Sequence, residues 1–244
     1  MPARHLYFIM TNTWNRLALL IFAVLSLLVA GELQAGVVVG GTRFIFPADR
    51  ESISILLTNT SQESWLINSK INRPTRWAGE ASTVPAPLLA APPLILLKPG
   101  TTGTLRLLRT ESDILPVDRE TLFELSIASV PSGKVENQSV KVAMRSVFKL
   151  FWRPEGLPGD PLEAYQQLRW TRNSQGVQLT NPTPYYINLI QVSVNGKALS
   201  NVGVVPPKSQ RQTSWCQAIA LCHVAWRAIN DYGGLSAKKE QNLP

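Results

Sequence analysis

The sequence predicts an all-β protein built from two β-sandwich domains. Prolines and glycines, 18 and 15 of the 244 residues, are spread along the chain, and long stretches of helical periodicity are absent. Short apolar segments with alternating patterns recur between turn signals instead. They form two sets of about a hundred residues each, separated by Glu155–Gly159, a Gly- and Pro-containing segment that we interpret as a linker.

Residues 1–35 have the pattern of a secretory signal peptide. Arg4 and Arg16 supply positive charge, and the run from Leu17 to Ala30 is almost entirely apolar. That run is short for a helix that spans a bilayer, and Ala35 offers a small residue at a cleavage site. We expect export and cleavage near Ala35; an uncleaved membrane anchor is the alternative.

The composition is basic, with a formal charge of +8. Residues 1–35 hold two arginines and one glutamate, so 24 − 2 = 22 basic and 16 − 1 = 15 acidic residues remain without them, a charge of +7. A basic chain can bind nucleic acid, but the export signal favours acidic proteins or carboxylates as partners. We therefore expect no nucleic-acid partner.

The chain has two cysteines, Cys216 and Cys222. Export places them in an oxidising compartment, where a disulfide forms and persists. We expect a Cys216–Cys222 disulfide; two buried free thiols are the alternative.

The first half reads as strands separated by turns. The expected strands are 36–47, 52–58, 65–71, 94–98, 104–109 and 121–130. Pro99-Gly100 predicts a hairpin between the fourth and fifth of these strands. From Phe123 to Ile127 apolar and polar residues alternate, with Glu124 on the polar face. Residues 72–93 lack periodicity and predict a long loop with short edge segments.

One long strand, from Val135 to Trp152, precedes the linker. Val140, Val142 and Met144 alternate with other residues and so share one face. An alternating row of this kind commonly fills a protein's own core, which is one interpretation. The second half of the strand carries large apolar side chains on both faces except at Lys149. Burying the unpaired ammonium of a lysine among such side chains is unfavourable. Lys149 therefore needs an explanation.

The second half of the chain repeats the pattern of short strands. The expected strands are 177–180, 185–194, 202–205, 215–221 and 223–229. Asn195-Gly196 predicts a type I′ hairpin. Residues 237–244 read as a polar tail.

The chain is poorly supplied for catalysis. His223 is the one histidine after residue 35, and no nucleophile, P-loop or metal-binding pattern surrounds it. Asp118 and Glu120 flank Arg119, which favours ion pairing over acid–base chemistry. We expect a protein that is not an enzyme, binds no cofactor and has no small-molecule substrate.

Nine segments, taken in order, resemble the periplasmic pilus (fimbrial) chaperones of the chaperone–usher pathway. They are Thr42–Pro47, Leu57–Asn59, Trp65–Ile67, Pro92–Pro93, Leu97–Gly100, Leu115–Phe123, Phe148–Pro154, Asn181–Tyr186 and Ile229–Gly233. Each alone is weak, but the ordered set is specific and extends from about Gly41 to Gly234.

The resemblance implies a domain plan. Two immunoglobulin-like domains are set at an angle with a cleft between them. The N-terminal domain spans 36–154 and carries a donor strand, 155–160 is the linker, and the C-terminal domain spans 161–244.

The resemblance also assigns roles to residues. Arg43 and Lys149 would grip the C-terminal carboxylate of a pilus subunit by charge-assisted hydrogen bonds; ordinary snorkelling of surface cations is the alternative. Val140, Val142 and Met144 would be lent to the subunit as part of a strand. A regular strand would aim Met144 and Lys149 oppositely, so we expect a bulge or strong twist between them.

Glu120, Arg153 and Asp231 match family positions that form a polar network between the domains. The implied function is a periplasmic chaperone that binds, folds and caps pilus subunits and passes them to an outer-membrane usher. The alternatives are a secreted immunoglobulin-like adhesin or carbohydrate-binding module, for which Trp77 could stack on sugar, and, less favoured, a secreted hydrolase.

Overall fold

The computed structural model describes residues 36–74, 86–110, 115–133, 141–200, 202–217 and 220–244. These residues form seventeen β-strands and one short 3-10 helix, η1 (Ala164–Gln167). No helix within the described ranges is long and apolar enough to cross a membrane. The predicted all-β class is confirmed.

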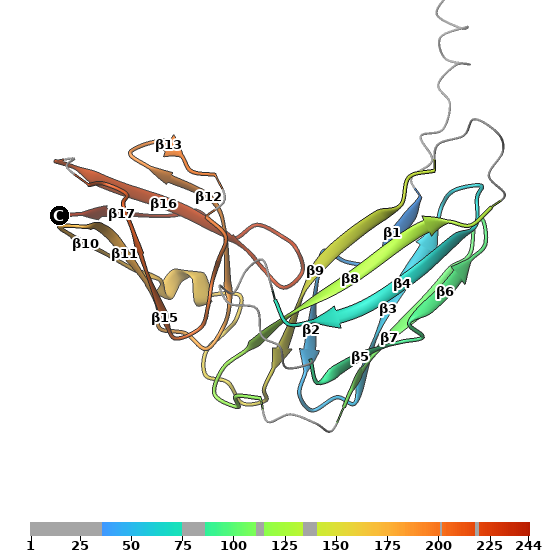
Figure 1. The fold of residues 1–244 in the computed structure, drawn as a ribbon. Coiled ribbons are helices and arrows are strands. Elements are labelled where there is room, and N and C mark those ends of the chain that lie inside the picture. Colours follow the sequence, from blue (N-terminus) through green and yellow to red (C-terminus); the bar gives the residue numbers. More distant parts are fainter. Residues whose placement is uncertain (1–35, 75–85, 111–114, 134–140, 201, 218–219) are drawn as a thin grey trace, which may run out of the picture. The chain divides into compact units, whose positions relative to one another are not determined.

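The first sandwich consists of two sheets (Figure 1). One has the order β1 (Val37–Val39), β3 (Ser52–Asn59), β7 (Thr102–Arg109), β5 (Leu88–Ala91). The other has the order β2 (Arg43–Pro47), β9 (Met144–Arg153), β8 (Thr121–Pro131), β4 (Trp65–Asn72), β6 (Leu94–Leu97). All neighbours are antiparallel except β2 and β9, which run parallel.

Alternating residues of these strands fill the core of the first sandwich. Leu105 and Leu107 in β7 are fully buried, as are Phe123 and Leu125 in β8. Since successive side chains point to opposite faces of a sheet, each strand offers one apolar face to the opposite sheet. Glu124, which we expected on a polar surface, is only 6% exposed.

The second sandwich has its own sheets and its own core. β10 (Arg169–Asn173), β11 (Gly176–Asn181) and β15 (Ser209–Thr213) form one sheet. β13 (Lys197–Ala198), β12 (Ile187–Val194), β16 (Cys222–Ile229) and β17 (Lys239–Leu243) form the other, and β14 (Val204–Val205) also pairs with β12. Trp170, Val177, Leu179, Val192 and Val224 are buried between the sheets. Two separate cores agree with the predicted pair of sandwiches.

The Asn195-Gly196 turn has the predicted conformation. Both residues have positive φ, 48° and 79°, as a type I′ turn requires. The turn joins β12 to β13, with Val194 opposite Lys197. The predicted hairpin is confirmed.

The predicted hairpin at Pro99-Gly100 is wrong. β6 pairs with β4, whereas β7 pairs with β3 and β5, so the turn carries the chain from one sheet to the other. Leu97 and Leu105 are both buried in the core and enter it from opposite sheets. The turn residues indicate a reversal of the chain but do not select the strand's partner.

The predicted polar tail at 237–244 is also wrong. Its residues Lys239–Leu243 form β17, which pairs with β16 from Cys222–Leu243 to Trp226–Lys239. Only Leu243 in this strand is buried. β17 lies at the edge of its sheet, and an edge strand can form from mostly polar residues. β10 and β15 were missed for the same reason: both are rich in polar residues.

The strand predicted at 215–221 does not form in the residues described there, 215–217 and 220–221. Residues 215–217 make a turn, and Cys216 has a positive φ of 58°. The preceding strand, β15, ends at Thr213. A left-handed residue interrupts a strand, and of the apolar residues here Cys216 is buried whereas Leu221 is 81% exposed.

Candidate functional site

Arg43 and Lys149 lie side by side. They are direct register partners in the parallel pair β2–β9, so their side chains stand on the same face of the sheet. The next residues, Phe44 and Leu150, face the core of the first sandwich. The two cations therefore project from the opposite face, away from that core.

The surroundings of both cations disfavour positive charge. Partial burial lowers the pKa of Arg43, an effect that Asp231 partly offsets. Burial also lowers the pKa of Lys149, and the neighbouring Arg43 charge lowers it further. Two adjacent, partly desolvated cations repel each other, so an anion placed between them would be stabilised.

Arg43 is held in position by the second sandwich. Its Nη1 donates to the backbone oxygen of Ile229 at 3.1 Å. Its Nε is buried and has no acceptor among the described residues. A fixed guanidinium with a remaining donor is suited to a carboxylate ligand.

The apolar row before Lys149 is exposed. Val142 is 64% and Met144 62% exposed, so the interpretation that these two fill the protein's own core is wrong. Val140 lies outside the described residues. β9 begins only at Met144, and Lys141–Ala143 lie outside any strand, so the predicted strand is too long at its start.

The register explains where β9 begins. Met144 pairs with Ser129, the last pair of the β8–β9 ladder. β8 ends two residues later at Pro131, which has no N–H to donate. Pairing of β9 with β8 therefore cannot continue far on the N-terminal side of Met144.

One edge of β9 is open over five residues. β9 pairs with β2 only from Lys149 to Arg153, whereas it pairs with β8 from Met144 to Trp152. Residues 144–148 thus have no second strand partner within the described part of the chain. Backbone groups on this edge can pair with a strand from another molecule.

The expected bulge between Met144 and Lys149 is absent. The β8–β9 register runs without a shift from Met144 to Trp152. Met144 and Lys149 therefore point to opposite faces, about 17 Å apart along the strand at about 3.3 Å per residue. A partner that contacts both must pair along the edge and reach the cations with a separate group.

Glu120, Arg153 and Asp231 are in direct contact. Arg153 Nε donates to Glu120 Oε1 at 2.7 Å, and Nη1 and Nη2 donate to the two Asp231 oxygens at 2.7 and 3.1 Å. Glu120 Oε2 accepts the Tyr186 N–H at 2.7 Å. Arg153 ends β9 and Asp231 follows β16, so the network joins the two sandwiches.

Burial and charge oppose each other in this network. Burial raises the pKa of Glu120, which is 3% exposed, while Arg153 partly offsets that shift. Burial alone would lower the pKa of Arg153, but its hydrogen bonds to Asp231 and the charge of Glu120 raise it well above its usual range. Glu120 therefore depends on Arg153 to remain ionised.

A second ion pair joins the sandwiches and was not predicted. Lys208 Nζ donates to Asp118 Oδ2 at 2.6 Å, and Arg119 Nε donates to Asp118 Oδ1 at 3.0 Å. These two hydrogen bonds hold the pKa of Asp118 well below its usual range. Ion pairing at this corner was expected, but Lys208 is 90 positions away and gives no sequence signal.

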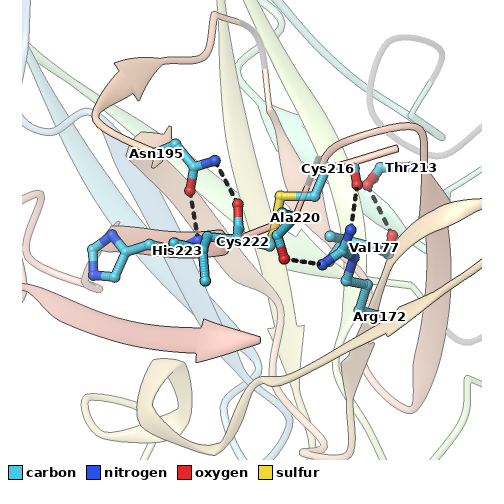
Figure 2. Close-up of a disulfide and its surroundings, with 9 residues drawn as sticks. Arg172, Val177, Asn195, Thr213, Cys216, Ala220, Cys222 and His223 are labelled. Carbon is cyan, nitrogen blue, oxygen red and sulfur yellow. Dashed lines mark hydrogen bonds between the residues drawn. A yellow bond between two sulfur atoms is a disulfide. The ribbon is translucent and has the colours of Figure 1, made fainter. Parts of the chain in front are cut away.

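Cys216 and Cys222 form a disulfide, so the free-thiol alternative is wrong (Figure 2). Arg172 donates to the Ala220 and Cys216 carbonyls at 3.1 and 3.3 Å. On the other side, Asn195 Nδ2 donates to the Leu221 carbonyl at 2.7 Å. The loop is thus fixed at both ends to the second sandwich.

His223 has no catalytic neighbours in the described structure. Its backbone N–H donates to Asn195 Oδ1, and its Nε2 lies 3.9 Å from Glu240. Trp77, the residue considered for sugar stacking, lies outside the described residues. No group of three or more potential metal ligands occurs within the described ranges.

Comparison with known families covers both sandwiches. Residues 36–158 match "Pili and flagellar-assembly chaperone, PapD N-terminal domain", and residues 163–240 match "Pili assembly chaperone PapD, C-terminal domain". The two-sandwich fold with an open strand edge agrees with this class. The chain belongs to the PapD family of pilus assembly chaperones.

Individual relatives carry the same description. The chain is 99% identical over 236 residues to "Uncharacterized fimbrial chaperone YcbF" of Escherichia coli strain K12, which covers 96% of this chain and 100% of that protein. It is 33% identical over 223 residues to "Chaperone protein FimC" of the same strain, with 89% of each covered.

Solved structures agree. A chain of the Salmonella enterica complex of SafA pilin with the SafB chaperone superposes with a TM-score of 0.71 and 28% identity, covering 87% of this chain and 98% of that one. The Escherichia coli chaperone DraB gives a TM-score of 0.72 at 28% identity, covering 86% and 97%.

Proposed function

We propose that this protein is a periplasmic chaperone that binds, folds and caps pilus subunits by lending them a β-strand, and then delivers them to an outer-membrane usher. The observation that carries the proposal is the open edge of β9, which exposes Val142 and Met144 beside the Arg43–Lys149 pair. The SafB chaperone, a structural relative, is known in complex with a pilin.

The lent strand would act through backbone and side chains together. A subunit strand that pairs with residues 144–148 would satisfy the N–H and C=O groups of that edge. Val140, Val142 and Met144 would enter an apolar groove of the subunit. Removing such side chains from water favours association by about 25 cal/mol per Å² of apolar surface.

The cation pair would anchor the subunit's C-terminal carboxylate. Lys149 and Arg43 stand on one face, and a carboxylate between them would accept charge-assisted hydrogen bonds from both. It would also relieve the repulsion between them. This anchor would fix the register in which the subunit strand pairs with β9.

Three further assignments complete the proposal. Residues 1–35 are an export signal that is removed, leaving an N-terminal domain of 36–154, a linker of 155–160 and a C-terminal domain of 161–244. The network of Glu120, Arg153 and Asp231 maintains the angle and the cleft between the domains. The protein works without catalysis or a cofactor.

Co-expression with a strand-deficient pilus subunit in the periplasm tests the proposal. Arg43→Ala and Lys149→Ala should each remain folded and lose stable capture of the subunit, because truncating one partner of an interfacial charge pair costs about 2–5 kcal/mol. Arg50→Ala, an exposed arginine just after β2, is the matched control and should capture normally. Normal capture by both cation variants would reject the carboxylate anchor.

A further inference from the structure

Arg211 is an unusual residue of the second sandwich. It lies in β15, at the edge of the three-stranded sheet, directly opposite Leu179 of β11. Register partners share a face, and Leu179 is fully buried, so Arg211 points inward between the two sheets. Its Nη1 donates to the backbone oxygen of Val202 at 2.7 Å.

The rest of the guanidinium has unused hydrogen-bond donors. Nε and Nη2 are buried and have no acceptor among the described residues. Burial lowers the pKa of Arg211, and no acidic neighbour offsets the shift. A partly buried cation without a counter-charge is unfavourable, and an anion would correct it.

Arg211 also lines a pocket of about 470 Å³, which is within the range of small-molecule sites. The other lining residues combine a cation, hydroxyl groups and apolar surface: Lys197, Ala198, Leu199, Ser200, Val202, Thr213 and Trp215. Trp215 stacks on the buried Trp170, with ring centroids 6.1 Å apart, so one wall is a rigid aromatic surface.

The neighbouring disulfide restrains this wall. Cys216 follows Trp215 directly, has a positive φ, and is bonded to Cys222 at the start of β16. Arg172 holds the Cys216 carbonyl from the adjacent strand β10 (Figure 2). Trp215 is therefore fixed in place before any ligand arrives, which reduces the ordering cost of binding.

We propose that this pocket binds a small amphiphile with one carboxylate or phosphate head and an apolar body. The head pairs with the positive charges of Arg211 and Lys197, which both line the pocket. The body lies against Trp215 and Leu199. The site belongs to the second sandwich alone and does not depend on the subunit-binding role of Arg43 and Lys149.

Titration of the periplasmic protein with three probes tests the site. Octanoate and octyl phosphate carry the two candidate heads, and octanamide is the uncharged analogue. Both calorimetry and tryptophan fluorescence should report saturable binding of at least one anion, with Trp215 as the optical reporter, and none of octanamide. The tighter anion identifies the head.

Variants locate the binding. Arg211→Gln should weaken anion binding by about tenfold, as expected when one of the two positive charges beside the head is removed. Arg211→Lys should retain part of the affinity. Arg169→Gln, an exposed arginine on the opposite edge strand β10, is the control and should bind normally.

Two results would overturn the proposal. One is no saturable response of the wild-type protein to either anion at millimolar concentration, which needs no variant. The other is equal anion binding by folded Arg211→Gln. If Arg211→Gln does not melt cooperatively, Arg211→Lys replaces it as the test variant. The proposal would then be rejected if Arg211→Lys binds the anion with unchanged affinity and the wild-type protein also binds octanamide.

Discussion

At the scale of single residues, the geometry of the Arg43–Lys149 pair supports the proposed carboxylate anchor. The two side chains stand together on one face of the β2–β9 pair, and burial lowers the pKa of each. Arg43 is already oriented by the Ile229 carbonyl. The two positive charges repel each other, and a carboxylate bound between them would reduce that repulsion.

This arrangement predicts a pH dependence. In the proposed anchor the charged form of Lys149 binds the carboxylate, so binding would raise the pKa of Lys149 from its lowered value in the free protein. As the pH rises through that lowered pKa, more of the free protein must take up a proton in order to bind, so affinity should fall. Calorimetry with a peptide of the subunit's C-terminus, from pH 7 upward, measures the effect.

The Lys149→Arg variant is the control for that titration. An arginine stays protonated throughout, so its affinity should change much less with pH. A peptide with an amidated C-terminus should bind weakly at every pH. Parallel pH profiles for wild type and Lys149→Arg would contradict a titrating lysine at the site.

Arg153 should contribute strongly to the free energy of unfolding, because it pairs with a buried carboxylate. Arg153→Ala leaves Glu120 buried without its partner, and breaking a buried pair in this way destabilises by about 3–5 kcal/mol. The raised pKa of Glu120 means that the folded state holds a proton more tightly than the unfolded chain. Without Arg153 the pKa of Glu120 should rise further, so the loss should be greatest above the variant's pKa and shrink as the pH falls from there toward the wild-type pKa.

Urea unfolding at pH 7 and pH 5 measures this loss. Lys208→Ala is the control, since it removes the exposed Lys208–Asp118 pair and should change stability little. A loss for Arg153→Ala as small as that for Lys208→Ala would show that the network does not stabilise the fold.

At the scale of elements, β9 has two different halves. Lys149–Trp152 lie between β2 and β8, whereas residues 144–148 pair on one side only. Val142 and Met144 extend the open half as exposed apolar side chains. The same segment thus contributes to the core at Leu150 and presents a free edge a few residues earlier.

Val142→Glu separates the two possible uses of this segment. Because Val142 is largely exposed, the variant should melt as the wild type does. It should nevertheless fail to capture a subunit, since the glutamate would enter an apolar groove without a counter-charge. Co-purification from periplasm, beside circular dichroism melts, measures both.

Val117→Glu is the matched control for Val142→Glu. Val117 is 79% exposed and lies outside β9, so the same substitution adds the same charge away from the open edge. It should retain capture. Loss of capture in both variants would attribute the effect to added negative charge rather than to the apolar row.

The disulfide should stabilise the second sandwich modestly. It closes a loop of six positions, for which the entropic estimate is about 2–3 kcal/mol. Replacing both cysteines by serine should lower the free energy of unfolding by that amount while leaving subunit capture intact. Urea unfolding of the double variant is the measurement, and an unchanged midpoint would contradict the prediction.

The sequence predicted those elements whose apolar pattern is strong. Phe123, Leu125 and Ile127 mark β8 correctly, and Asn195-Gly196 marks its hairpin. The pattern could not show which sheet β6 joins, because pairing depends on distant strands. It also missed β17, since an edge strand with polar residues has no apolar period.

The site was predicted to a similar degree. The resemblance selected Arg43, Lys149 and the Glu120–Arg153–Asp231 set, and the structure places each group together. It assigned a donor strand at Val140–Met144 but not the extent of the open edge, 144–148, which follows from where β2 stops pairing. Lys208 and Arg211 gave no signal, because their importance lies in contacts made across the fold.

At the scale of the whole molecule, two sandwiches with separate cores contribute to one site. β9 supplies the strand edge and Lys149, while the second sandwich supplies the Ile229 carbonyl to Arg43 and Asp231 to Arg153. The PapD family assignment covers both sandwiches. The central claim is that a subunit strand completes the sheet at the open half of β9.

Amide hydrogen exchange tests that claim most directly. In the free protein, the amides of residues 144–148 that face the open edge should exchange rapidly, whereas those of the buried Leu150–Trp152 should be protected. On addition of a strand-deficient pilus subunit, the open-edge amides should become protected, and they should remain unprotected in Val142→Glu. Unchanged exchange at 144–148 in a stable complex, with new protection at another edge such as β6 or β15, would contradict the account.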